Sequence, residues 1–112
     1  MTFDVNLEMV NHIAKITMAG ELDASVAEQF KGKIEEAVEQ EARRVVLIVD
    51  GLEYMSSAGL RILVFAKQKM DTSVEIFVVG AKPNILLPIK QTGLHHSLTL
   101  LDTYDAEIID NL

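Results

Sequence analysis

Residues 43–67 read RRVVLIVDGLEYMSSAGLRILVFAK, and this stretch decides the fold. The continuous aliphatic and β-branched run at 45–49 is typical of a strand covered on both faces in a parallel sheet, closed by Asp50 and Gly51. From Ser57 to Met70 the residues are strong helix formers. One apolar stripe follows them at helical spacing: Gly59, Ile62, Leu63, Ala66 and Met70. The stretch therefore predicts a buried strand, a turn and a helix, which is the repeating unit of an α/β fold.

Two strands are predicted at the N-terminus. Residues 3–9 alternate apolar and polar side chains, with the period of two of an edge strand that has one wet face. Asn11 and His12 offer a tight turn, and residues 14–18 alternate again. We expect a second strand that pairs antiparallel with the first and ends near Gly20.

A helix is predicted between the second strand and residue 43. Ser25 and Glu28 have the S-x-x-E spacing of a capping box, so the helix should begin there and run to about Glu39. Its predicted apolar face contains Val26, Phe30, Ile34, Ala37 and Val38.

The last third of the chain continues the alternation of strands and helices. Pro88 predicts that the third helix starts late or is kinked, because proline lacks an amide donor and collides with the preceding turn. The predicted elements are a buried strand at 74–80, a short helix at 83–93, a strand at 98–102 and a helix at 103–112. The order ββαβαβαβα predicts an α/β fold with a mixed, mostly parallel sheet of about five strands and about four helices packed on it.

Composition narrows the function classes. The 112 residues fit one domain spanning 1–112, and the net charge of −7 disfavours nucleic acid and bare anionic membranes as direct partners. No cysteine is present, and no stretch reaches the roughly 20 apolar residues of a membrane-spanning helix. The N-terminus lacks the basic start and continuous apolar stretch of a signal peptide. We expect a cytoplasmic protein, a monomer or weak dimer, whose partners are proteins.

Two serines, Ser56 and Ser57, stand in the turn after the central strand. In open α/β sheets such turns carry binding and chemistry, because free amides of helix N-termini converge there. Taken alone, either serine is best explained as an N-cap, whose hydroxyl accepts from the next turn of the helix and contributes about 1 kcal/mol. Ala58 and Gly59 would then be small because the helix start packs closely on the sheet.

Three segments together carry a resemblance to a known family. They are GELDAS at 20–25, VVLIVDGLEYMSSAGLRILVFAK at 45–67 and KQTGL at 90–94. The chain resembles the STAS domain of the anti-sigma factor antagonists over nearly its whole length. The family's central motif is D-S-[ST]-G-L, and its first serine is phosphorylated by a kinase that is also an anti-sigma factor. Ser57 stands at the phosphoacceptor, Ala58 at the small or hydroxyl residue after it, and Gly59 and Leu60 match the last two positions. Ser56 stands where the family commonly has aspartate.

The resemblance implies a regulatory protein without enzymatic activity or cofactor. The dephosphorylated form would bind an anti-sigma factor with serine kinase activity and release the sigma factor; phosphorylation of Ser57 would stop this, and a phosphatase would reverse it. STAS domains also occur in transporters and signalling assemblies, so a non-phosphorylated scaffold or ligand-binding subunit is the alternative. The expected partner-binding residues are Asp23, Ser56, Ala58, Gly59, Leu60, Arg61 and Val64.

Three of these residues also have plain structural explanations. Asp23 matches the family's aspartate near the phosphoacceptor, yet it could simply favour a helix start electrostatically. Leu60 and Val64 could form part of a docking patch or complete a wide core face of the helix. Arg61 is expected to be exposed.

Other classes of site are poorly supported. A response-regulator receiver would use an aspartate at a strand end such as Asp50, but its acidic pair and its lysine after the last strand are missing. The hydrolase motif G-x-S-x-G is absent, because Met55 stands two residues before Ser57. His95 and His96 are adjacent, so we expect their side chains to diverge, with no shared metal.

Overall fold

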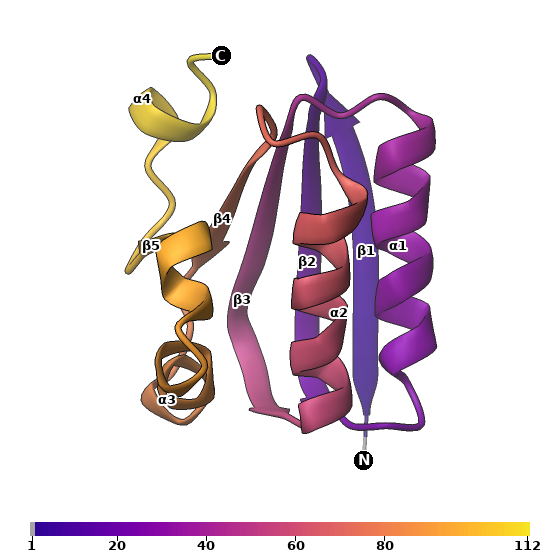
Figure 1. Ribbon diagram of the computed structural model, residues 1–112, viewed down its shortest axis with the longest axis vertical. Helices are drawn as coiled ribbons and strands as arrows, with labels where there is room; N and C mark the ends of the chain where they lie inside the picture. The colour runs from indigo at the N-terminus through magenta and orange to yellow at the C-terminus, as the bar shows by residue number, and fades with distance from the viewer. Residues whose placement is uncertain (1) are drawn as a thin grey trace.

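The computed structural model describes residues 2–112, which form one five-stranded sheet with helices packed on it (Figure 1). The elements, in chain order, are β1 (Phe3–Val10), β2 (Ile13–Leu22), α1 (Ala27–Glu39), β3 (Arg44–Met55), α2 (Ser57–Lys69), β4 (Glu75–Val79), α3 (Pro83–Gln91), the 3-10 turn η1 (Leu94–Ser97), β5 (Thr99–Leu101) and α4 (Ala106–Ile109). The predicted order and α/β class are confirmed.

The strands lie side by side in the order β1-β2-β3-β4-β5. β1 pairs antiparallel with β2 through a tight turn at Asn11 and His12, and both turn residues have positive φ. All other neighbours are parallel, so β2 to β5 have their carboxyl ends at one edge of the sheet. Helices α2 and α3 begin at that edge (Figure 1).

The main core lies between the sheet and one layer of three helices. Its central side chains are Phe30 and Ile34 of α1, Leu63 of α2, and Ile85 and Ile89 of α3, each at most 3% exposed. They pack on alternate strand residues, such as Ile16, Leu47 and Val78. Burial of the predicted α1 face and of Leu63 and Ala66 on α2 confirms the helical periodicity that the sequence shows.

The opposite face of the sheet carries a smaller core. Ile13, Val46, Phe77 and Val79 pack there with Ile109 of α4, which is fully buried. The C-terminal segment therefore covers part of the face that α1, α2 and α3 leave free.

The central strand is longer than predicted. β3 continues past Asp50 and Gly51 to Met55, and β2 continues past Gly20 to Leu22. The two strands stay paired through two register shifts, between Thr17 and Ala19 and between Gly20 and Glu21. Asp50 and Gly51 read as a strand end because polar residues and glycine are rare in strands, but a bulged pair accommodates them.

The predicted capping box at α1 is wrong. The helix begins at Ala27, and its N-cap, Val26, has no side chain that can cap. The Ser25 hydroxyl instead donates to Asp23 Oδ1 at 2.6 Å, and the Ser25 amide donates to the same oxygen at 2.9 Å. Ser25 is thus part of an Asx-type turn, which competed successfully with the cap.

Three details near the C-terminus also differ from the prediction. α3 begins at Pro83 and not later, because Pro83 is favourable in the first turn of a helix. Pro88 lies inside the helix. The turn η1 was not predicted. The last helix covers only Ala106–Ile109, because the side chain of Asp105 caps it late and it ends at Asp110.

Candidate functional site

Ser56 is built into the start of α2. Its backbone amide donates to the carbonyl of Leu22 at 2.8 Å, which ties the turn to the end of β2. Its hydroxyl accepts from the amide of Gly59 at 3.3 Å, so Ser56 is the N-cap of the helix. The sequence left the cap open between the two serines, and the structure assigns it to Ser56.

Ser57 is the first residue of α2 and is exposed. It lies at the carboxyl edge of the sheet, where the free amides of the first helical turn point outward. The first turn contains no acidic residue, and Lys67 and Lys69 occupy the last turn. The helix dipole at this position therefore favours an anion, with no carboxylate in that turn to oppose it.

Gly59 lets the helix start lie against the sheet. A Cβ atom at this residue would be 2.8 Å from Leu22 Cδ2 and 2.8 Å from Met55 Cγ. No side chain fits without moving these two core residues, so the close packing expected at this glycine is confirmed. The same packing fixes where the preceding serines point.

Asp23 lies beside the serines through the pairing of the strands. Leu22 pairs with Met55, so the residues that follow, Asp23 and Ser56, leave neighbouring strands at the same level. The hydrogen bonds of the Asp23 carboxylate go to Ser25 and hold the pKa of Asp23 below its ordinary value. Among the residues that the structure describes, none of its hydrogen bonds reaches Ser57.

The other expected docking residues divide by exposure. Arg61 is exposed, as predicted, and Val64 is 37% exposed. Leu60 is half-buried and packs against the main core, so the core explanation accounts for part of this side chain. Tyr54, which the sequence did not single out, is 46% exposed near the end of β3.

A polar cluster connects α3 to β3 at the same edge of the sheet. Lys82 Nζ lies 2.7 Å from Glu53 Oε1, and Asn84 Nδ2 donates to the carbonyl of Glu53 at 2.9 Å. These contacts tie the start of α3 to the last part of β3. The sequence analysis did not predict these contacts. Polar residues that follow the strand at 74–80 could have indicated them, because parallel strands end at the same edge of the sheet.

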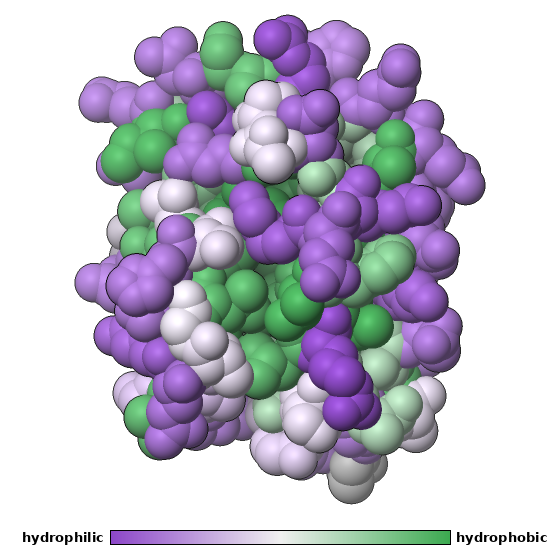
Figure 2. All heavy atoms as spheres, in the orientation of Figure 1, coloured by the Kyte–Doolittle hydropathy of each residue, from purple (hydrophilic) through white to green (hydrophobic). Residues whose placement is uncertain are grey.

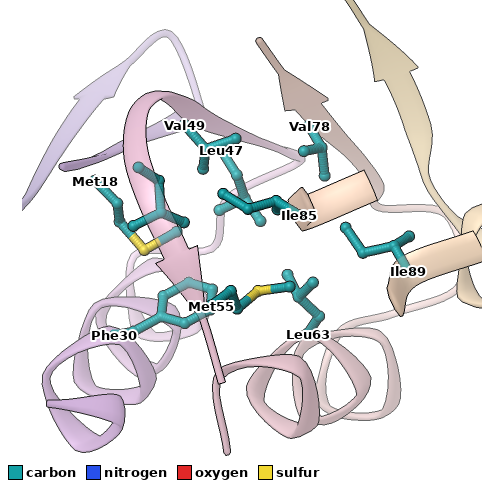
Figure 3. A pocket seen from close by; sticks show the side chains of 10 residues that line it. Met18, Phe30, Leu47, Val49, Met55, Leu63, Val78, Ile85 and Ile89 are labelled. Carbon is teal, nitrogen blue, oxygen red and sulfur yellow. The ribbon is translucent and has the colours of Figure 1, made fainter. Parts of the chain in front are cut away.

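Apolar atoms reach the surface between α2 and α3. Figure 2 shows a green strip in the space that separates these helices in Figure 1. Beneath it lies an apolar cavity of about 10 Å³, lined by side chains that include Met18, Phe30, Met55, Leu63 and Ile85 (Figure 3). A space of this size is near the minimum for one water molecule, and its lining offers no polar partner, so it is a packing defect and not a ligand site.

Asp50 and the histidines do not form alternative centres. Asp50 lies within β3, not at its end, which removes the strand-end position that a receiver acceptor requires. The rings of His95 and His96 have their centroids 4.0 Å apart, so the prediction that they diverge is wrong: the tight 3-10 turn brings them together. Within residues 2–112, no group of three or more potential metal ligands occurs.

Comparison with known proteins identifies the family. The family model for the STAS domain matches residues 4–107, so the chain belongs to the STAS family. The chain is also 30% identical over 97 residues to the anti-sigma-F factor antagonist RsfB of Mycobacterium tuberculosis, a match that covers 86% of this chain and 80% of RsfB.

Solved structures agree with this assignment at the level of the fold. An anti-sigma factor antagonist from Mycobacterium paratuberculosis has a TM-score of 0.86 and 24% identity, with 96% of this chain and 92% of that chain covered. The anti-sigma factor antagonist SpoIIAA is similar in its unphosphorylated form, with a TM-score of 0.76, 22% identity and 96% of each chain covered. Its phosphorylated form has a TM-score of 0.74 and 23% identity, with 96% and 98% covered. None of the helices in residues 2–112 has the length and apolar character needed to cross a membrane.

Proposed function

We propose that this protein is an anti-sigma factor antagonist switched by phosphorylation of Ser57. The dephosphorylated form binds an anti-sigma factor that is also a serine kinase and thereby frees the sigma factor. Phosphorylation by that kinase ends the binding, and a phosphatase restores it. The observation that carries the proposal is the exposure of Ser57 at the start of α2, next to Ser56, whose hydroxyl already caps the helix.

Electrostatics supports a switch that acts on binding and leaves the fold intact. A phosphate adds about −1.5 to −2 charges at neutral pH. The free protein tolerates the charge of the phosphate at the N-terminus of α2, because the helix dipole favours an anion there. A partner whose docking face fits the neutral hydroxyl would bury the phosphate charge without a counter-charge, at a cost of several kcal/mol. SpoIIAA has been solved with and without phosphate, and this chain has TM-scores of 0.74 and 0.76 to the two forms.

We expect the docking surface to surround Ser57. The proposed contact residues are Asp23, Ser56, Ala58, Gly59, Leu60, Arg61 and Val64. Gly59 is buried and acts by placing the turn, whereas Arg61 and Val64 offer exposed side chains. The name of the relative RsfB, an anti-sigma-F factor antagonist, supports a regulatory role. We propose that a single domain over residues 1–112 carries out this role in the cytoplasm, without catalysis.

The phosphoacceptor can be identified directly. The purified protein is incubated with its cognate anti-sigma factor kinase and with ATP, and the peptide containing Ser56 and Ser57 is analysed by tandem mass spectrometry. We expect one phosphate, on Ser57. Ser56→Ala should still be phosphorylated, because its hydroxyl serves the helix cap, whereas Ser57→Ala should not.

Two results would contradict the proposal. Phosphate on Ser56 would show that the cap hydroxyl is available to the kinase. Absence of phosphate, with binding of the unmodified protein to a transporter or signalling complex, would favour the scaffold role.

A further inference from the structure

The outer edge of β1 is an open strand edge. β1 is the last strand of the sheet on its side, and within the described residues it pairs only with β2. It is eight residues long and alternates regularly between half-buried and exposed side chains, without proline. Such an edge offers a row of unpaired amides and carbonyls to another extended chain.

A groove runs beside this edge, between β1 and α1. Its volume is about 540 Å³ and it is open to solvent. The lining residues are Val5 of β1 and Glu28, Gln29, Gly32, Lys33 and Glu36 of α1. A strand added to β1 would therefore direct every second side chain into this groove.

Gly32 has no role in the fold that the structure reveals. It lies in the middle of α1, its φ is not positive, and a Cβ atom there would meet no atom within 4 Å. Glycine in a helix interior costs about 0.5–1 kcal/mol relative to alanine. The absence of a side chain does, however, keep the floor of the groove free.

The charges around the edge select the occupant. Asp4 and Glu8 are exposed on the face of β1 that points away from the helices. Glu8 lies opposite Lys15 of β2, whereas Asp4 lies opposite Ala19 and has no basic cross-strand partner. Glu28 and Glu36 border the groove on the helix side, and Lys33 is already paired with Glu36 at 3.1 Å. A second copy is disfavoured, because its own β1 would place Asp4 and Glu8 against the same carboxylates.

We propose that the β1 edge and the α1 groove bind an extended basic segment of a protein partner as an additional strand. The basic side chains of that segment lie opposite Asp4 and Glu8, and its alternate side chains, which are small, enter the groove over Gly32 beside Val5. Main-chain hydrogen bonds supply affinity and the groove supplies selectivity, as in other strand-addition complexes. β2 separates this edge from β3, the strand that leads to Ser57, so the site goes beyond the switch at Ser57.

The test uses a synthetic peptide of alternating lysine and valine, eight residues long, titrated into the ¹⁵N-labelled full chain. It is measured by NMR at about 0.15 M salt, where distant charges are screened. Two matched peptides carry N-methyl groups on every lysine or on every valine. Amides of alternate residues point to opposite edges of a strand, so one methylated peptide should bind and the other should not. Shift changes should map to β1 and to the groove side of α1.

The matched protein variants are Gly32→Leu and Gly32→Ala. Leucine should fill the groove and weaken binding at least about tenfold, whereas alanine should weaken it less. Circular dichroism should show both variants folded, because a side chain at this position meets open space. The proposal is overturned by absence of binding, by equal binding of the two methylated peptides, by unchanged binding to Gly32→Leu, or by shifts spread over other acidic surfaces. Concentration-dependent shifts in β1 without peptide would identify a second copy as the occupant and overturn it as well.

Discussion

Two adjacent hydroxyls have different roles at the start of α2. The Ser56 hydroxyl accepts a hydrogen bond from the amide of Gly59, and Ser57, the next residue, is exposed. The family's aspartate at the position of Ser56 would also be a good N-cap, so its replacement by serine keeps the helix start. What the replacement removes is a negative charge next to the proposed acceptor.

This division predicts different costs for the two alanine variants. Ser56→Ala should lower the free energy of unfolding by about 0.5–1 kcal/mol, in the lower part of the range for N-caps, because the bond to Gly59 is 3.3 Å long. Ser57→Ala should change it by less than about 0.5 kcal/mol, as is usual at exposed positions. Urea denaturation of both proteins measures the difference, and equal losses would argue against Ser56 as the cap.

Two glycines on neighbouring helices should respond to alanine in opposite directions. Gly59→Ala should destabilise the protein by about 1–3 kcal/mol, because the new Cβ collides with Leu22 and Met55. Gly32→Ala, the control, should stabilise it by about 0.5–1 kcal/mol, because the helix gains propensity and nothing is displaced. Loss of stability in both variants would contradict the assigned roles.

The residues of the site were predictable to different degrees. The motif at 56–60 predicts Ser57 as the acceptor, which stays a prediction, whereas the three-dimensional structure distinguishes the capping serine from the exposed one. Asp23 was placed correctly beside the serines, while its bonds to Ser25 were not foreseen, because an Asx-type turn and a capping box use the same residue types. The contacts of Glu53 with Lys82 and Asn84 depend on the register of separate crossovers.

At the scale of elements, Arg44 holds the short C-terminal helix on the sheet. Its Nη1 donates to the carbonyls of Ile108 and Ile109, both at 2.9 Å, and Nη2 lies 3.5 Å from Glu75 Oε1. The guanidinium group also lies over the ring of Phe77 at 5.2 Å. A four-residue helix is not stable by itself, so these contacts and the buried Ile109 fix it.

Arg44→Lys should loosen α4 selectively. Lysine keeps the charge but loses the planar fork that reaches two carbonyls, and we expect a loss of about 1–2 kcal/mol. Hydrogen exchange should accelerate at the amides of Ile109 and Asp110, which bond within the segment, and change little in β3. Arg43→Lys, at an exposed neighbouring position, is the control. Uniform acceleration in both variants would show that Arg44 does not act locally.

Elements with clear periodicity were predicted better than their ends. The apolar stripes of α1 and α2 and the alternation of β1 set the order and the layers. The extension of β3 depends on bulged pairing with β2, and α4 depends on Arg44 from a distant strand. Contacts between residues far apart in the sequence produce no local sequence pattern. The ends of the strands and of the terminal helix were therefore predicted incorrectly.

At the scale of the whole molecule, an ion pair connects the C-terminal segment to the sheet. Lys15 Nζ lies 3.4 Å from Asp110 Oδ1, and Tyr104 donates to Asp110. The hydrogen bond from Tyr104, followed by the attraction of Lys15, lowers the pKa of Asp110 below 3.8. The neighbouring Tyr104 side chain, over whose ring Lys15 Nζ lies at 5.1 Å, and the Asp110 carboxylate raise the pKa of Lys15.

These shifts predict a specific acid dependence. A carboxylate with a lowered folded pKa stabilises the fold above its unfolded pKa, and this contribution disappears as the pH falls through the folded value. Wild type should therefore be more stable than Asp110→Asn at neutral pH, and the difference should shrink towards about pH 2. Denaturation midpoints across this range measure the effect, with Glu35→Gln on the exposed side of α1 as the control. A difference that is constant with pH would refute the role of the Asp110 charge.

We expect an anion added at Ser57 to decide whether the partner can dock on the surrounding surface. The most direct measurement is calorimetric titration of the cognate anti-sigma factor with wild type, Ser57-phosphorylated protein, Ser57→Asp and Ser57→Ala. We expect wild type and Ser57→Ala to bind with similar affinity, and the two charged forms to bind at least about 100-fold more weakly, with unchanged circular dichroism. Equal affinity for the phosphorylated and unmodified proteins would contradict the account.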